Sequence, residues 1–180
     1  MLTFQGMSDA DKLNDIEILN KALFFENQGV WAYRFAADKL TASKVGKAVL
    51  ELASQNRADH QKHQNLVGDA IRDLGGTPVQ MEREYDLSAL IRRGEGNVDS
   101  DVNIAKLALA LEIGAAVGYV TDTTKLRSPY LIDLGAGIAC VEAIHAARIR
   151  DAFNHLGITI PVVPNAVMNA SSRDDWVIQV

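Results

Sequence analysis

A carboxylate followed seven residues later by a tyrosine occurs twice in this chain, and this repeat constrains the fold more than any other feature. Glu26 precedes Tyr33 and Glu112 precedes Tyr119, with 86 residues between the two copies. Both pairs lie in apolar segments with helical spacing, where residues three, four and seven apart share one face. The repeat therefore predicts two equivalent helices, each directing an acid and a tyrosine toward a common interior.

Each copy is followed by a second polar pair whose members are three residues apart. His60 and His63 follow the first copy, and Glu142 and His145 follow the second, with an offset of 82 residues between the pairs. Ionisable groups inside an apolar core are costly unless something neutralises them. A bound metal ion is the simplest compensation, so the pattern predicts a metal site between four helices.

The periodicity predicts an all-α fold, a four-helix bundle made of two antiparallel helix hairpins. A crossover over residues 75–99, with a short helix near 86–93, is expected to join the hairpins, and an irregular tail is expected over 157–180. A single domain over 1–180 accommodates this arrangement. The four long helices are expected at about 9–40, 43–74, 100–126 and 130–156.

The composition excludes several classes of function. A net charge of −5 without a basic cluster gives no footprint for nucleic acid. The single cysteine, Cys140, excludes an internal disulfide framework and is expected to be a small buried residue. The stretch from Ile104 to Val120 is the most membrane-like, but Lys106 and Glu112 within it favour a buried bundle helix and no membrane.

The two ends of the chain carry separate expectations. Residues 1–6 resemble the remnant of an engineered protease site, and no secretory leader is visible, so a cytoplasmic location is expected unless a leader was removed. The apolar residues 176–180 are expected to dock on this chain or on a neighbouring subunit. A homo-oligomer is plausible, with a dimer favoured, and Trp31 and Trp176 are expected to anchor packing.

Over about residues 9–156 the chain resembles the ferritin-like superfamily, in particular small bacterial ferritin-like and rubrerythrin-like di-metal carboxylate domains. Some of those also carry Gly-Gly-Thr-Pro after the second helix, as this chain does at 75–78. The resemblance implies metal ligands on all four long helices. These are Glu26, His63, Glu112, Glu142 and His145.

One position departs from the pattern of that superfamily. The resemblance implies a bridging glutamate three residues before His63, where this chain has His60. A histidine usually offers one nitrogen to one ion, so we expect His60 to be a sixth ligand or a base beside the ligands. Tyr33, Tyr119 and Asp59 are expected to contact the ligands without binding metal.

The resemblance implies iron or manganese, with zinc possible, at one or two ions per chain. The expected function is a metal-dependent oxidoreductase that acts on oxygen, peroxide or ferrous iron. The alternative is a non-enzymatic, stress-associated or structural bundle in which His60 marks a degenerate or single-metal site. An assembly component whose apolar tail docks elsewhere is a third possibility.

Overall fold

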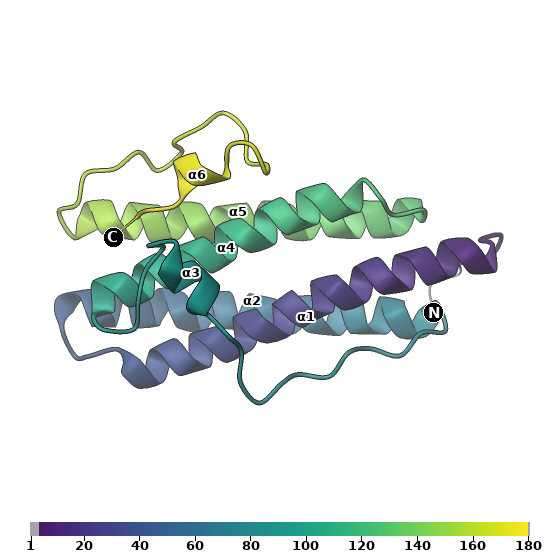
Figure 1. Ribbon diagram of the computed structural model, residues 1–180, viewed down its shortest axis with the longest axis horizontal. Coiled ribbons are helices and arrows are strands. Elements are labelled where there is room, and N and C mark those ends of the chain that lie inside the picture. Colours follow the sequence, from purple (N-terminus) through teal and green to yellow (C-terminus); the bar gives the residue numbers. More distant parts are fainter. Residues whose placement is uncertain (1–3, 180) are drawn as a thin grey trace.

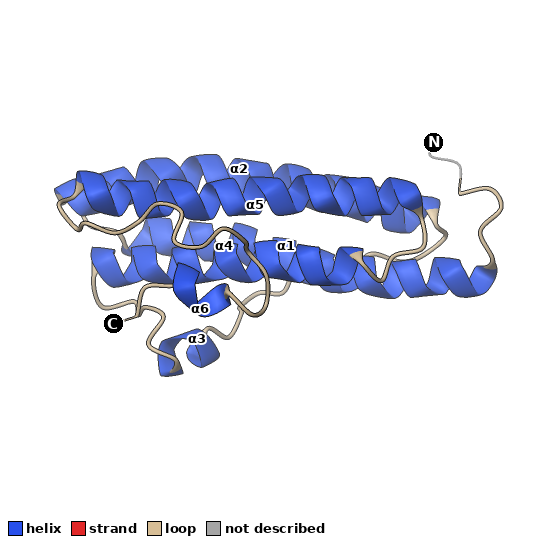
Figure 2. Ribbon diagram, turned by 90° about the horizontal axis from the view of Figure 1, so that it is seen from above, coloured by secondary structure: helices blue, strands red, loops and turns tan. Residues whose placement is uncertain are grey.

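The computed structural model describes residues 4–179, and within them the chain is all-helical. Four long helices form an elongated bundle, with two short helices at its side (Figures 1 and 2). The all-α prediction is confirmed. The long helices are α1 (Asp9–Lys39), α2 (Lys44–Asp73), α4 (Asp101–Thr123) and α5 (Pro129–His155), and the short ones are α3 (Ser88–Arg92) and α6 (Arg173–Trp176).

Local sequence signals set the helix ends. Ser8, Ser43 and Ser100 each accept a hydrogen bond from a backbone N–H in the first turn of α1, α2 and α4, which satisfies a group that the helix leaves unpaired. Gly75 follows α2 with a φ of +88°, a left-handed conformation that glycine adopts without strain. Pro129 opens α5 at a position where its missing N–H costs nothing.

The helices pair as two antiparallel hairpins, α1 with α2 and α4 with α5, and the crossover between them carries α3 (Figure 1). Asp15 on α1 helps to join the hairpins. Its buried carboxylate accepts hydrogen bonds from the backbone N–H groups of Arg127 and Ser128, at 2.8 and 2.9 Å, just before α5 begins. The long crossover lets both hairpins place their first helices side by side, α1 beside α4.

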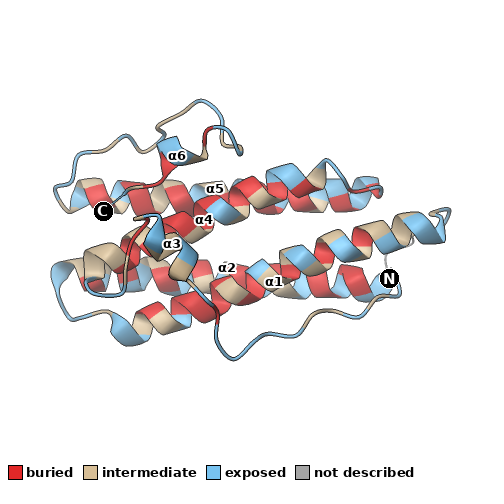
Figure 3. Ribbon diagram, in the orientation of Figure 1, coloured by how far each residue is buried: buried red, intermediate tan, exposed pale blue. Residues whose placement is uncertain are grey.

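The buried residues face one another along the bundle axis (Figure 3) and form two main apolar clusters. On α2 the histidines lie between Val49 of one cluster and Val67 of the other. On α5 the Glu142–His145 pair lies between Ala139 and Ala146, which likewise belong to different clusters. The polar residues therefore occupy a layer between two apolar ends.

The tail docks on its own chain, with α6 packed near α4. Trp176 is buried in an apolar cluster, and its indole N–H donates to the backbone carbonyl of Val167 at 3.1 Å. Arg173 forms two hydrogen bonds of 2.7 Å with the buried Glu95 carboxylate of the crossover. The expected docking of the tail is thus met for residues up to 179, and the expectation of a wholly irregular tail is wrong because Arg173–Trp176 is helical.

Two other expectations concern Cys140 and the first six residues. Cys140 is exposed, because it lies on the outward face of α5 with Ala136 and Ile144, so the expectation of a buried cysteine is wrong. The error arose because α5 is apolar on its outward face as well as its inward one. The interpretation of residues 1–6 as a remnant falls partly on residues 1–3, which lie outside the described residues.

Two helices, α4 and α5, are long and apolar enough to cross a membrane by length and composition alone. Core helices of soluble proteins pass the same test. In this structure the two helices pack against each other, and their inward faces carry the buried residues Glu112, Glu142 and His145.

Candidate metal centre

Six ionisable side chains from the four long helices meet in the polar layer of the bundle. Each residue is at most 6% exposed, so water contributes little to stabilising their charges. The structure brings together all six residues that the sequence marks as candidate ligands. They are Glu26 on α1, His60 and His63 on α2, Glu112 on α4, and Glu142 and His145 on α5.

The six residues form two overlapping groups, each with the spacing to hold a metal ion. Within each group the candidate ligand atoms all lie within 4.8 Å of one another. His60 and Glu142 belong to both groups. The first group adds Glu26 and His63, and the second adds Glu112 and His145.

In the first group, two nitrogens and two oxygens surround one point. His60 Nδ1 lies 2.8 Å from Glu26 Oε2, and His63 Nδ1 lies 2.9 Å from Glu142 Oε1. The diagonal separations are 3.7 Å from His60 Nδ1 to Glu142 Oε1 and 3.5 Å from His63 Nδ1 to Glu26 Oε2. Carboxylate oxygen and imidazole nitrogen suit iron, manganese and zinc alike.

The second group has the same composition. His145 Nδ1 lies 3.3 Å from Glu112 Oε2 and 3.3 Å from Glu142 Oε2. His60 contributes its other nitrogen, with Nε2 at 3.5 Å from Glu112 Oε2. Glu142 thus directs one oxygen to each group, because its Oε1 faces His63 and its Oε2 faces His145.

The two tyrosines hold the carboxylates in a crossed arrangement. Tyr119 on α4 donates to Glu26 Oε1 on α1 at 2.6 Å, while Tyr33 on α1 donates to Glu112 Oε1 on α4. Each glutamate therefore has one oxygen fixed by a hydroxyl and the other directed at the histidines. Burial and the neighbouring carboxylates raise the pKa of both tyrosines well above the ordinary value, so both remain donors.

Two further residues, Asp59 and Asn56, support the candidate ligands. Asp59 Oδ2 lies 3.3 Å from His145 Nε2, so His145 turns its Nδ1 toward the glutamates. An outer partner of this kind fixes the tautomer and orientation of a ligating histidine. Asn56, which is buried, donates to Tyr33 Oη at 2.9 Å and to Glu112 Oε1 at 3.0 Å.

Gly29 on α1 makes room for the imidazole of His60. A Cβ at this position would lie 3.0 Å from His60 Nδ1 and Cε1, closer than an unstrained contact allows. Sequence reasoning missed both Gly29 and Asn56. Asn56 lies one helical turn before His60 on the same face, which is a signal for its position, whereas nothing in the sequence marks Gly29.

The histidines hold protons more tightly than free histidine does. Burial by itself would lower their pKa values, but the adjacent carboxylates outweigh it. The pKa of His63 rises to about 9 through Glu142 and Glu26. That of His145 rises to about 10 through Glu112 and Glu142, and that of His60 also lies well above its ordinary value.

The pKa values of the three buried carboxylates shift in different directions. Burial would raise the pKa of Glu26 and of Glu112, but hydrogen bonds and charges from the histidines bring both pKa values below normal. Burial and the charge of Glu112 raise the pKa of Glu142. An added positive charge would therefore lower the pKa of Glu142 and favour its ionised form, which burial and Glu112 disfavour.

Two buried candidate ligand atoms that lack a hydrogen bond also favour a cation at this site. Among residues 4–179, His63 Nδ1 and Glu142 Oε1 are buried without a hydrogen bond of acceptable geometry, although they lie 2.9 Å apart. Most buried polar atoms in proteins are satisfied. Both atoms belong to the first group, where a cation between them would satisfy both.

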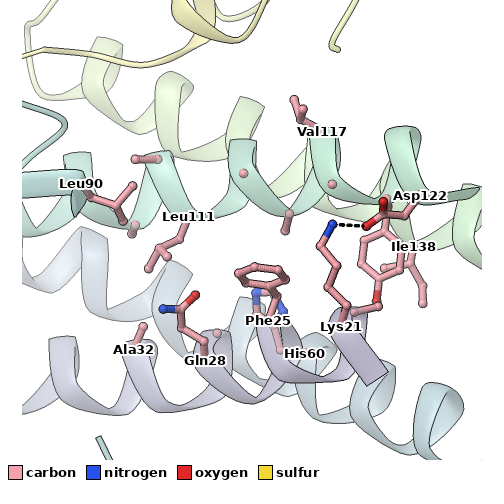
Figure 4. Close-up of a pocket in the computed structure, with 18 of the residues that line it drawn as sticks. Lys21, Phe25, Gln28, Ala32, His60, Leu90, Leu111, Val117, Asp122 and Ile138 are labelled. Atoms are coloured by element: carbon pink, nitrogen blue, oxygen red, sulfur yellow. Dashed lines mark hydrogen bonds and ion pairs between the residues drawn. The ribbon is translucent and has the colours of Figure 1, made fainter. Parts of the chain in front are cut away.

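A cavity of about 500 Å³ lies between α1 and α4 and reaches the centre. Its walls are mainly apolar, and Tyr33, Tyr119 and His60 form part of its lining. In Figure 4, Phe25 and Gln28 project from α1 and Leu111 projects from α4 into the space between these helices. The volume is within the range of small-molecule sites, and the cavity borders the centre at His60 and the two tyrosines.

Comparison with known proteins agrees with the helical arrangement. No curated protein matches the chain significantly. A family model described as a ferritin-like domain matches residues 14–155, which include α1 from Asn14 onward and the whole of α2, α4 and α5. The chain belongs to the ferritin-like domain family.

Proposed function

We propose that this protein binds one or two divalent cations between its four long helices and that the loaded centre reacts with oxygen, peroxide or ferrous iron. The observation that carries the proposal is the pair of buried four-residue groups, each with candidate ligand atoms within 4.8 Å of one another. Iron or manganese is the proposed resident metal, and zinc fits the same donors.

The roles of the residues follow from their positions. Glu26, His63, Glu112, Glu142 and His145 are the proposed ligands, together with His60. Tyr33, Tyr119 and Asp59 orient three of them through the contacts described above. When bound, the metal ions supply open coordination positions and Lewis acidity for the reacting molecule.

The apolar cavity supports access by a small neutral oxidant. Its lining residues include His60, Tyr33 and Tyr119, so a molecule in the cavity lies beside the centre. Phe25 and Leu111 are among the apolar lining residues, and apolar walls of this kind favour the exclusion of water from a reacting centre. The two tyrosine hydroxyls would hold the carboxylates in place around a bound metal.

Ferrous iron oxidation tests this function. Protein freed of metal is mixed with Fe(II) in air, and formation of Fe(III) is followed by absorbance against buffer alone. We expect oxidation faster than in buffer, abolished by Glu142→Gln and retained by Glu51→Gln, an exposed acid on α2. Equal rates with wild type, Glu142→Gln and buffer would refute the reaction, and the same assay with peroxide separates the two oxidants.

One observation favours a structural bundle as the second candidate. Three histidines face three glutamates, and the pKa of His63 is raised to about 9 and that of His145 to about 10. The protonated cluster is then balanced in charge without any metal. In that case Fe(II), Mn(II) and Zn(II) would leave the melting temperature unchanged, because a ligand stabilises only a fold that binds it.

A further inference from the structure

His60 differs from the other candidate ligands because its two ring nitrogens face different groups. Nδ1 lies 2.8 Å from Glu26 Oε2 in the first group, and Nε2 lies 3.5 Å from Glu112 Oε2 in the second. The tyrosines do not compete for these positions, because each binds the other oxygen of its glutamate. The ring of His60 thus lies between the two groups, with one nitrogen directed at each.

The separations within the two groups lie on both sides of the value expected between ligands of one tetrahedral ion. Metal–nitrogen and metal–oxygen bonds of about 2.0–2.1 Å place tetrahedral ligand atoms about 3.3 Å apart. The measured separations are 2.8, 2.9, 3.5 and 3.7 Å in the first group. Those in the second group are 3.3, 3.3 and 3.5 Å. Each set consists of two nitrogens and two oxygens, one nitrogen of each being from His60.

The charges of the six candidate ligands favour one form in which His60 would bind. Glu26, Glu112 and Glu142 supply three negative charges, whereas two divalent cations carry four positive ones. An uncompensated charge in a buried layer is expensive. An imidazolate supplies the missing negative charge and, unlike neutral imidazole, has a lone pair on both nitrogens. The substitution of histidine for a bridging glutamate then conserves both the bridge and the charge.

We propose that His60 bridges two divalent cations as an imidazolate, with Nδ1 on the ion of the first group and Nε2 on the ion of the second. Binding of the second ion displaces the remaining ring N–H proton, which passes to water or buffer. Glu142 forms the second bridge, with one oxygen on each ion. The cations are those that bind imidazole readily, such as zinc, copper, iron and nickel. This inference rests on the metal binding of the proposed function.

Copper(II) tests the bridge by spectroscopy, without any assay of activity. Metal-free protein is titrated with Cu(II), bound copper is counted by mass spectrometry, and the EPR signal is integrated. Two Cu(II) ions joined by an imidazolate couple antiferromagnetically, so we expect binding of a second copper to remove most of the EPR intensity. His60→Gln, which offers no second nitrogen, should bind copper with the full intensity of isolated ions.

Two variants control for the other ligands. His63→Gln removes a nitrogen from the first group only, so any chains that bind two coppers should retain the coupling. His155→Gln, on the exposed end of α5, should behave as wild type. Circular dichroism establishes that each variant remains helical. Rescue of two-ion binding by His60→Glu would show that a bridging side chain is what the position requires.

The possible failures are distinguishable. No copper bound by the folded wild-type protein would overturn metal binding and the bridge together. A single copper, or two coppers with full EPR intensity, would overturn the bridge and leave metal binding intact. Coupling that persists in His60→Gln would assign the exchange to Glu142 and would also overturn the proposal.

Discussion

At the scale of single residues, the centre depends on hydrogen bonds that cross between the two hairpins. Tyr119 fixes Glu26 and Tyr33 fixes Glu112, so each carboxylate has one oxygen left for the histidines. A hydroxyl that donates to a buried carboxylate makes a charge-assisted bond, stronger than a neutral one. The tyrosines therefore stabilise the fold and orient the candidate ligands through the same contact.

Tyr119→Phe tests this contact. The change removes the hydroxyl but keeps the ring, leaving Glu26 Oε1 buried without its donor. We expect the free energy of unfolding of the metal-free protein to fall by about 1–3 kcal/mol. Urea denaturation measures the loss, with Tyr130→Phe as the control because Tyr130 is 40% exposed. Equal losses in the two variants would contradict the role of the bond.

The raised pKa values of the histidines predict how metal-free stability depends on pH. The folded-state pKa of His63 is about 9 and that of His145 about 10, above the unfolded value of about 6.5. The folded state then binds more protons than the unfolded state between these limits. Stability from the histidines is complete below about pH 6.5 and is lost as pH rises through 9 and 10.

Urea unfolding of metal-free protein at pH 6.5, 8 and 10 checks the sign. We expect the free energy of unfolding to decline across the series, with a shallower decline for His63→Gln. We expect added metal to reverse the trend, because cations compete with the same protons and bind more tightly as pH rises. Metal-free stability that increases from pH 6.5 to 10 would contradict the raised pKa values of His63 and His145.

At the scale of helices, the close approach of α1 and α2 sets the position of His60. Gly29 has no side chain, so the imidazole of His60 lies against the backbone of α1. Glycine inside a helix costs about 1 kcal/mol relative to alanine. Gly29 carries this cost at a position where a larger side chain would press against the candidate ligand His60.

Gly29→Ala is expected to strengthen α1 and weaken metal binding together. The new Cβ would meet His60 at 3.0 Å, so the ring must shift. Gly114→Ala on α4 is the matched control, since nothing lies within 4 Å of its Cβ. Calorimetric titration with Zn(II) should give at least a tenfold weaker affinity, about 1.4 kcal/mol, for Gly29→Ala alone. Equal affinities for both variants would show that the ring position does not depend on this glycine.

The helices and the convergence of their polar faces could be predicted because helical spacing fixes which side chains share a face. Glu112 and Tyr119 are seven residues apart, and this alone indicates one helix face. The direction of each ring nitrogen of His60 could not be predicted, since it depends on the packing of α1 against α2. The exposure of Cys140 was missed because hydrophobicity does not distinguish the two apolar faces of α5.

At the scale of the whole molecule, the tail completes one end of the bundle. Arg150 on α5 donates to the backbone carbonyls of Pro161 and Trp176, which fixes two points of the tail. Glu95 joins the crossover to the tail through Arg173. Neither Trp176 nor Arg150 belongs to the metal groups, so these contacts act on stability separately from the centre.

Trp176→Ala tests whether the tail contributes to stability without affecting metal binding. The indole is 5% exposed, and truncation of a buried tryptophan costs about 3–5 kcal/mol. We expect the free energy of unfolding to fall by about 3 kcal/mol. Proteolysis of the tail should be faster, and the number of bound ions should be unchanged. Val167→Ala, at a position 54% exposed, is the control. A loss of bound metal with the loss of Trp176 would show that the tail supports the centre directly.

The central claim is that six polar side chains are stable at the middle of an apolar bundle because they bind cations. Its most direct test is metal analysis by mass spectrometry of protein purified without chelators and then equilibrated with Fe(II), Mn(II) or Zn(II). We expect up to two ions per chain, one for each group, and almost none in the double variant Glu26→Gln/Glu142→Gln. Far less than one ion per folded wild-type chain with every metal would contradict it.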